Sequence, residues 1–340
     1  MRRCLALAAT AGLMACSQPE TQAPADAEPP VIPAAEPAAD TDTAPAEAAG
    51  LPGTDIHIFA LDWVNGQPVV GAPMGGVIRP GYDNQPAFTP DGSGLLYTAG
   101  DDSGETDIWR LDLATGATVP VTRTADESEY SPRVPPGEAA LAYIYQPPGG
   151  YAGNAYLADA DNSDRRPAEQ LAPVGYYLFS GDMRHVVTFA LGETTNTLQL
   201  IDRTADPEAP QFVADNPGRA MARNLVGDGA WVTLTRPDGG TAVHRLDFAT
   251  GTLRDGFALP SDSMDFARIT SPISGMFAFD GFFSAAGGTL YYGTVSADFA
   301  AASLSPAWTE IADLTALGLA EVNRIAVSPG ADRIAFVAAD

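Results

Sequence analysis

The stretch RLDLATG at residues 110–116 returns as RLDFATG at residues 245–251, which is 135 positions further along the chain. That separation is three periods of 45 residues. A fixed period of this length is typical of repeat proteins in which each repeat is one four-stranded sheet. The recurring stretch therefore predicts an all-β chain built from such sheets.

A second motif follows the same period. It consists of an apolar run, a turn rich in Pro, Gly and Asp, and a second apolar run, which together predict a β-hairpin. The first copy contains PAFTPDG at residues 86–92, and the six copies end at residues 97, 143, 189, 234, 292 and 336. Their spacings are 46, 46, 45, 58 and 44 residues, so we expect an insertion in the fifth repeat, in either 252–281 or 296–322.

Each predicted hairpin is followed by a third strand that ends on an aspartate, as in IWRLD at residues 108–112. The alternating apolar residues suit a strand packed between neighbouring sheets. The turn that follows, DLATG at residues 112–116, has glycine where a positive φ is needed. We therefore expect the repeated stretch to end a strand and begin a tight turn.

The two ends of the repeat array complement each other. The array begins near Asp55 with a third strand that no hairpin precedes, and it stops at Asp340 directly after a sixth hairpin. Residues 55–72 can therefore supply the outer strands that residues 323–340 lack, which leaves no unpaired edge. The sequence thus predicts a six-bladed β-propeller of four-stranded antiparallel blades over residues 54–340, with its ring closed by shared N- and C-terminal strands.

The repeat motifs resemble those of a known family. PAFTPDG at 86–92, followed by DIWRLDLATG at 107–116 and by Val121 and Thr122, is similar to the WD40-like PD40 repeat of TolB-type β-propellers. The resemblance covers roughly residues 55–340 and is most specific in the first two copies. It implies a propeller fold. TolB itself is a periplasmic propeller preceded by an α/β domain, which we do not expect here, so its own role carries over only weakly.

Residues 1–15 predict a lipoprotein signal peptide. Arg2 and Arg3 precede a short apolar run, which is too short to span a bilayer. The run ends in LMAC at residues 13–16, which resembles a bacterial lipobox. The resemblance implies cleavage and a lipidated Cys16. The alternative is an ordinary signal peptide with an incidental cysteine.

Residues 16–53 predict a disordered tether, because they are rich in Ala, Pro and acidic residues and contain no aromatic residue. Ser17, the residue after the expected lipidation site, resembles the residue that directs lipoproteins to the outer membrane. We therefore expect a location in the bacterial cell envelope, on the periplasmic side, with the outer membrane favoured over the inner. Cys4 leaves with the signal peptide, so no intramolecular disulfide is expected.

The charge of the chain is strongly negative. The 43 acidic residues outweigh 18 basic ones, all of them arginine, and the net charge is −25. Such a surface repels nucleic acid and anionic membrane, so no nucleic-acid partner is expected and the membrane is reached through the lipid anchor only. It suits a monomeric, soluble domain in a salty environment, or one with a basic partner.

No catalytic or metal-binding motif is recognisable. The three histidines, His57, His185 and His244, come from different repeats, so neither a metal site nor a cofactor is expected from them. The stretch at 159–164 begins like an EF-hand loop but lacks the glycine at position six and the glutamate at position twelve. In the acidic loop at 101–107, a solvated polar turn is favoured over a cation site.

Arginines are the first candidate binding residues. Those near the predicted start of an innermost strand, which lines the central channel of a propeller, are Arg133, Arg223, Arg268 and Arg324. An arginine-lined channel would attract anions, because guanidinium pairs well with carboxylate or phosphate. The alternative is that each arginine pairs with an aspartate of a neighbouring blade.

Tyrosines on one face are the second candidates. Loops between the second and third strands, and between the fourth and first strands, emerge on the same face of a propeller. Those loops are expected at 98–107, 145–154, 235–241, 123–131, 172–177 and 213–222, and they carry Tyr130, Tyr145, Tyr151, Tyr176 and Tyr177. Exposed tyrosine is a good interface anchor, although Tyr176 and Tyr177 can equally fill gaps between blades.

Two functions remain open at this point. The first is an envelope-anchored lipoprotein whose propeller is a non-catalytic scaffold for a protein or peptide. The second is a propeller enzyme of the lyase or lactonase type that acts on a sugar or lactone at the central channel. The second requires converging histidine or acidic ligands, and the sequence identifies no such set.

Overall fold

The computed structural model describes residues 51–100, 104–137, 139–150, 152–206, 208–224, 228–260, 263–270, 279–296 and 306–340. The chain from Ala49 to Asp340 is one compact unit. The predicted signal peptide and most of the predicted tether lie outside the described residues, and so do Cys16 and Tyr151. In the described part, no helix is long and apolar enough to cross a membrane.

The described residues form twenty-four β-strands, most of them in four-stranded antiparallel sheets. The strands of the first two sets are β3 (Tyr82–Phe88), β4 (Gly94–Gly100), β5 (Thr106–Asp112) and β6 (Thr118–Pro120), then β7 (Ser128–Arg133), β8 (Leu141–Gln146), β9 (Asn154–Ala158) and β10 (Arg166–Pro167). The third set is β11 (Val174–Phe179), β12 (His185–Ala190), β13 (Thr197–Asp202) and β14 (Gln211–Asp215).

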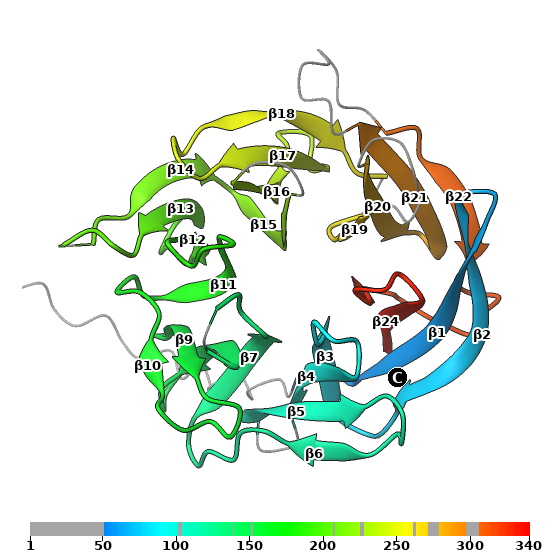
Figure 1. Cartoon of the computed structure of the whole chain (residues 1–340), viewed down its shortest axis with the longest axis horizontal. Helices are drawn as coiled ribbons and strands as arrows, with labels where there is room; N and C mark the ends of the chain where they lie inside the picture. Colours follow the sequence, from blue (N-terminus) through cyan, green and yellow to red (C-terminus); the bar gives the residue numbers. More distant parts are fainter. Residues whose placement is uncertain are drawn as a thin grey trace, which may run out of the picture. The chain divides into compact units, whose positions relative to one another are not determined.

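The remaining sets follow the same plan. The fourth is β15 (Pro217–Arg223), β16 (Gly229–Thr235), β17 (Thr241–Asp247) and β18 (Leu253–Ala258). The fifth is β19 (Ala267–Thr270), β20 (Phe279–Ala286), β21 (Thr289–Ser296) and β22 (Thr309–Asp313). The last joins the two ends of the array and consists of β23 (Arg324–Val327), β24 (Arg333–Ala339), β1 (Thr54–Val64) and β2 (Gln67–Val77). Figure 1 shows these sets side by side around a centre, with β3, β7, β11, β15 and β19 towards it.

The N-terminal strand of the array pairs with its C-terminal strand. β1 is antiparallel to β24 from the pair Thr54 and Ala339 to the pair Ala60 and Arg333. β1 also touches β3 in parallel, at the single pair Thr54 and Tyr82, which links the first and last sets into one eight-stranded sheet. The expected pairing of early residues with the end of the chain is therefore present in the structure.

The apolar core lies between neighbouring sets and not within any one of them. Each cluster draws alternate residues from the facing strands, as Val187 of β12 and Val232 of β16 do between the third and fourth sets. Six such clusters occur in the described residues, and one of them joins Ile58 of β1 and Val337 of β24 to Leu95 of β4. Burying an apolar side chain of this size contributes about 1.5–3 kcal/mol, so each set depends on its neighbours for stability.

The repeated stretch forms the same tight turn in both copies. In the first copy, the Asp112 carboxylate accepts hydrogen bonds from the backbone nitrogen and the hydroxyl of Thr115, both at 2.8 Å, and Gly116 follows with φ 73°. Asp247 accepts the same two bonds from Thr250 at 3.0 Å. The expectation of a positive-φ glycine is correct. The two stretches expected to hold the fifth-repeat insertion include residues 271–278 and 297–305, which are outside the described part.

Candidate functional site

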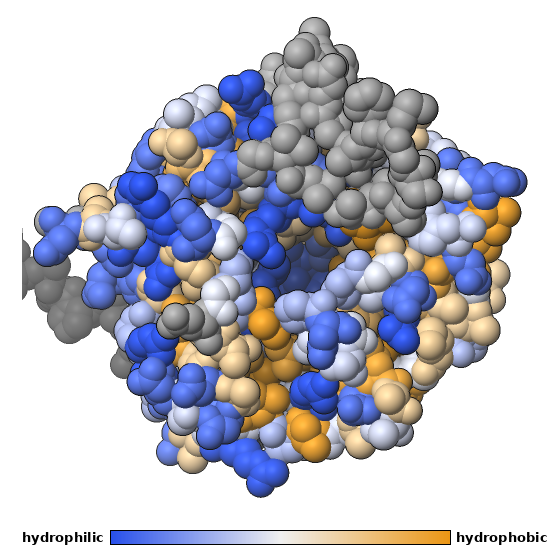
Figure 2. Space-filling model, in the orientation of Figure 1, coloured by the Kyte–Doolittle hydropathy of each residue, from blue (hydrophilic) through white to orange (hydrophobic). Residues whose placement is uncertain are grey.

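A cavity of about 270 Å³ lies where the inner strands converge, and residues from β3, β7, β11, β15, β19 and β23 line it. A second cavity of about 270 Å³ adjoins it and shares Arg133 and Arg268 with it. Figure 2 shows a hollow at the centre of the visible face, with mostly hydrophilic residues at its bottom. The arginines that line the two cavities are Arg133, Arg219, Arg223, Arg268 and Arg324, and we call this pair of cavities the arginine channel.

The four predicted arginines thus meet in one place, but two of them sit elsewhere on their strands than expected. Arg324 and Arg268 are the first and second residues of β23 and β19, as predicted. Arg133 and Arg223 are instead the last residues of β7 and β15. The prediction is wrong for these two because β7 and β15 begin earlier than the apolar pattern indicates. Polar and small residues there still pair with β8 and β16.

Arg219 is a fifth channel arginine that the sequence analysis missed. It lies on β15, four residues before Arg223, and residues at that spacing point to the same side of a regular strand. Its Nε lies 3.6 Å from an Asp265 carboxylate oxygen and has no hydrogen-bond acceptor in the described residues. In the stretch GRAMAR at residues 218–223, the two arginines are four positions apart, which places them on the same side of a strand. That spacing could have revealed Arg219 from the sequence.

The channel arginines differ in how their charge is balanced. The Arg268 guanidinium pairs with the buried carboxylate of Asp280, on the neighbouring strand of the same sheet. Arg324 donates a hydrogen bond to the Tyr176 hydroxyl at 2.9 Å, and its guanidinium lies 5.5 Å from the centre of that ring. Among the described residues, no carboxylate lies within ion-pair distance of Arg133 or Arg223. The alternative expectation, that each of the four predicted arginines pairs with an aspartate of a neighbouring blade, is met by none of them in the described residues. The channel arginine that does form such a pair there is Arg219, with Asp265.

Burial and mutual repulsion both act on these charges. Burial lowers the pKa of the Arg133 guanidinium. Burial also lowers the pKa of Arg219 and Arg223, and the nearby charges of Arg324 and Arg268 respectively lower them further. Like charges brought together in a confined space favour a bound anion, because the anion reduces their repulsion. The channel is therefore a positively charged site in a strongly negative protein.

The tyrosine assignments need correction. Tyr145 lies in β8 and not in a loop, because the apolar pattern of LAYIYQ continues through it. Its ring is 4.7 Å from the ring of Tyr156, and the Arg165 guanidinium lies 5.1 Å from its centre. Its hydroxyl donates to Glu127 at 3.2 Å. These contacts make Tyr145 part of a packed cluster and not a free anchor.

Three of the other candidate tyrosines also lie in strands. Tyr130 is a half-buried residue of β7 that packs against the core between the second and third sets. Tyr177 of β11 is fully buried, and its hydroxyl donates to the Ser131 carbonyl at 3.0 Å, which is the gap-filling role given as the alternative. Tyr176, its neighbour, lines the arginine channel. Tyr151 lies outside the described residues.

The sequence matches no protein-family model and no curated protein. Solved structures do match. A structure from Agrobacterium tumefaciens that carries the name TolB aligns with a TM-score of 0.53 at 15% identity, over 86% of this chain and 99% of that chain. The fold is a TolB-like β-propeller. At this identity the likeness concerns the propeller fold and not the activity.

Two further propellers align at lower scores. TolB from Acinetobacter baumannii has a TM-score of 0.48 at 13% identity, over 84% of this chain and 64% of that chain, so the present propeller spans less than two thirds of it. A gluconolactonase from Xanthomonas campestris has a TM-score of 0.48 at 14% identity, over 69% of this chain and 85% of that chain.

Proposed function

We propose that this chain is a non-catalytic binding protein of the bacterial cell envelope, and that its propeller takes an acidic segment of a protein or peptide into the arginine channel. The observation that carries the proposal is the charge balance of the channel. Five guanidinium groups line it, and only Asp265 and Asp280 pair with them in the described residues. A carboxylate is the planar anion that guanidinium binds best in a two-pronged geometry.

The net charge of −25 does not oppose this proposal at short range. Charges further apart than about 8 Å are largely screened at physiological salt. Inside the channel a ligand therefore experiences mainly the nearby arginines, and the acidic outer surface affects mainly the rate of approach. We expect a partner with a short acidic segment at a terminus or loop, because a uniformly acidic surface would be repelled.

The propeller that holds this channel is proposed to have six blades. In this arrangement β23, β24, β1 and β2 form the sixth blade, and the single residue pair between β1 and β3 is an incidental contact between two blades. The ladder between β1 and β24 supports a ring closed by shared strands. The six apolar clusters support it as well, because each joins one set to the next and the series returns to its start.

Acidic peptide binding is the direct test of the channel. The probes are an acetylated hexaglutamate peptide and its hexaglutamine counterpart, titrated by calorimetry into the detergent-solubilised chain. We expect binding of the first only. Arg133→Gln and Arg223→Gln should each weaken it by about tenfold or more, which corresponds to about 1.4 kcal/mol.

The matched control for these variants is Arg236→Gln, because Arg236 is an exposed arginine that pairs with Asp238 away from the channel. Binding of the hexaglutamate peptide by this variant should equal that of the unmodified chain. Equal affinity for the two peptides, or full affinity in the Arg133→Gln/Arg223→Gln double variant, would refute the channel as the binding site.

The envelope location is proposed from the lipobox resemblance at Cys16. Cys16→Ser should release the chain from the membrane fraction into a soluble or unprocessed form. A processed variant that still partitions into detergent would show that another feature holds the chain at the membrane. The alternative function, a lyase or lactonase acting at the channel, stays a prediction. Turnover of a sugar lactone that is lost in Arg133→Gln would favour it.

A further inference from the structure

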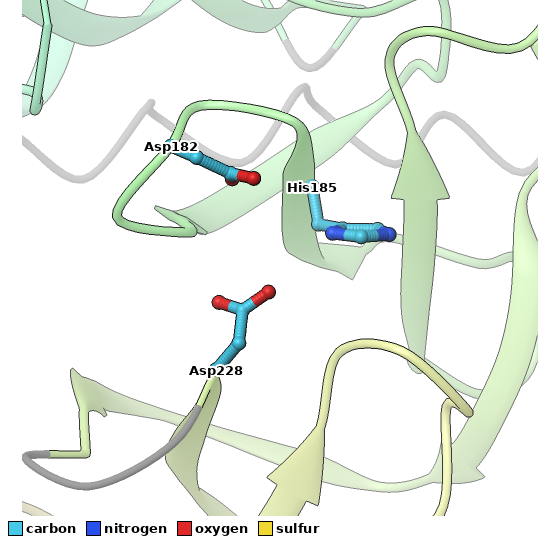
Figure 3. A group of neighbouring side chains, drawn as sticks. All are labelled: Asp182, His185 and Asp228. Carbon is cyan, nitrogen blue, oxygen red and sulfur yellow. The ribbon is translucent and has the colours of Figure 1, made fainter.

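A group of three potential metal ligands lies apart from the arginine channel. Asp182, His185 and Asp228 each place a ligand atom within 4.8 Å of the others. Figure 3 shows the two carboxylates on the same side of the imidazole, facing one of its ring nitrogens. A cavity of about 380 Å³ adjoins all three residues, so an ion and its remaining waters have space.

The residues come from two different sheets. Asp182 lies in the turn between β11 and β12, His185 begins β12, and Asp228 directly precedes β16. The sequence predicted no metal site, because its three histidines come from different repeats. This group instead combines one histidine with two aspartates that stand 46 residues apart, which is one repeat period.

The Asp182 carboxylate is held in place by its own turn. One of its oxygens accepts a 2.6 Å bond from the Ser180 hydroxyl and a 3.0 Å bond from the backbone nitrogen of Arg184. The Arg184 guanidinium is directed to Asp202, at 2.8 Å, and so forms its ion pair elsewhere. The second oxygen of Asp182 is therefore left for another partner.

His185 carries the observation that points to a ligand. Its ring stacks on Phe248, with 6.0 Å between ring centres and an angle of 16° between planes. Its Nδ1 is a buried atom with no hydrogen-bond partner in the described residues. A buried ring nitrogen without a partner costs free energy, and metal coordination would satisfy it.

We propose that Asp182, His185 and Asp228 bind one divalent zinc ion that links the third and fourth sheets. One imidazole nitrogen and two carboxylate oxygens are a donor set that zinc accepts, with water completing the coordination. Calcium and magnesium prefer oxygen ligands alone and fit this set less well. The ion would neutralise the two facing carboxylates and hold two hairpin turns together at the surface of the propeller.

The test is zinc binding by the full chain after dialysis against a chelator. Calorimetry with zinc chloride should give one ion per chain with a dissociation constant of about 1 μM or tighter, which corresponds to about −8.2 kcal/mol. His185→Gln and Asp228→Asn should each weaken binding by about tenfold or more, since each removes one of three ligands. At a zinc concentration near the dissociation constant of the unmodified chain, zinc should also raise the melting temperature of that chain by more than it raises that of either variant.

The matched control is Asp91→Asn. Asp91 occupies the same place in the turn between β3 and β4, where it accepts bonds from Thr89 and Ser93, but it has no histidine beside it. Zinc binding by this variant should equal that of the unmodified chain. Melting curves in chelator show whether each variant folds. If His185→Gln does not fold, zinc binding by Asp228→Asn tests the proposal, because Asp228 is exposed. The absence of saturable zinc binding in the unmodified chain, or undiminished binding in a folded Asp228→Asn chain, overturns the proposal.

Discussion

At the scale of single residues, Asp280 connects the core of the propeller to its channel. It is 2% exposed, and its carboxylate accepts a 2.9 Å bond from the Trp231 indole nitrogen of the fourth set. The same carboxylate accepts a 2.5 Å bond from Nε of Arg268. Both partners donate to a charged acceptor in a place without bulk water, where such bonds are strongest. The position of Arg268 in the channel wall therefore depends on this one buried carboxylate.

Removing that charge should destabilise the fold. Asp280→Asn leaves the largely covered Arg268 guanidinium without its counter-charge and weakens the bond that the Trp231 indole donates, so we expect a loss of about 3 kcal/mol in the free energy of unfolding. The control is Asp238→Asn, which alters an exposed pair with Arg236 and should cost less than about 1 kcal/mol. Urea denaturation measures both. Similar midpoints for the two variants would contradict a stabilising role of the buried pair.

A second buried acid sets a pH dependence. Glu129 is fully buried, and burial raises the pKa of its carboxyl to about 7, although the Thr124 hydroxyl donates to it at 2.8 Å. Because this folded-state pKa lies above the unfolded one, the folded chain binds the proton more tightly. Glu129 therefore favours folding more as the pH falls from about 7 to about 4.5, and it opposes folding above pH 7.

Glu129→Gln should remove the part of the pH dependence that Glu129 causes. Burial also raises the pKa of Glu169 to about 7 and that of Asp83 to about 6, and these two acids keep their own part in both chains. At pH 8 the variant should be more stable than the unmodified chain by about 2–3 kcal/mol, and the difference should shrink towards pH 5. Acids whose pKa is lowered, such as Asp91 at about 2, titrate below this range and do not interfere. Thermal melts between pH 5 and 8 measure the effect, with Glu310→Gln as an exposed control. Parallel curves for the variant and the unmodified chain would show that Glu129 is not the group responsible.

At the scale of elements, β1 and β2 form the most irregular pair of the propeller. Their register shifts twice, after Ile58 and after Phe59. Gly75 and Gly76 lie opposite this irregularity on β2, with φ of 98° and 153°. A Cβ on Gly76 would lie 1.9 Å from the carbonyl oxygen of Ile56, whereas a Cβ on Gly75 would meet nothing within 4 Å. The close approach of the two strands is therefore possible only with glycine at position 76.

The two neighbouring glycines make a matched pair of variants. Gly75→Ala should cost about 1 kcal/mol, because alanine must adopt a positive φ but has space. Gly76→Ala should cost about 2 kcal/mol more, because β2 must move away from β1 to admit the methyl group. Chemical denaturation of the full chain gives both values. Equal losses would mean that the positive φ alone sets the cost of each substitution, and that β2 can move away from β1 without a further loss of stability.

At the scale of the whole molecule, stability depends on a strand from the start of the array. Ile56, Ile58, Phe59 and Leu61 of β1 are all nearly fully buried, in clusters shared with β24 and with the first and fifth sets. At about 1.5–3 kcal/mol for each side chain, they contribute about 6–12 kcal/mol. That is comparable to the entire stability of a typical domain, about 5–15 kcal/mol.

Deletion of residues 51–72 should therefore abolish cooperative folding or lower the melting temperature severely, because β24 loses one of its two partner strands and two clusters open. Deletion of residues 17–50, the predicted tether, should leave the melting temperature nearly unchanged. Calorimetric melts of the two shortened chains are the measurement. Equal melting temperatures would contradict both the role of β1 in the core and the proposed closure of the ring.

The repeat plan of the propeller could be predicted from the sequence, because the interactions that produce it are local. The stretch at 110–116 recurs because a carboxylate and a threonine close the same turn in each copy, and these bonds join residues only three positions apart. Strand alternation is equally local. The complementary ends of the array predicted the partner of β1, and the general position of inner strands predicted that Arg133, Arg223, Arg268 and Arg324 would line one channel.

The pairing of side chains from different sheets could not be predicted from the sequence. Arg219 faces Asp265 across two sets, and Asp182 approaches His185 and Asp228 from different sheets. These meetings depend on how far and at what angle neighbouring sheets pack, which no short stretch of sequence specifies. The same holds for Tyr145 and Tyr177, whose rings are covered by residues from elsewhere in the chain. Repetition is a local property of the chain, whereas the charge balance of a shared channel is set by all the sheets around it together.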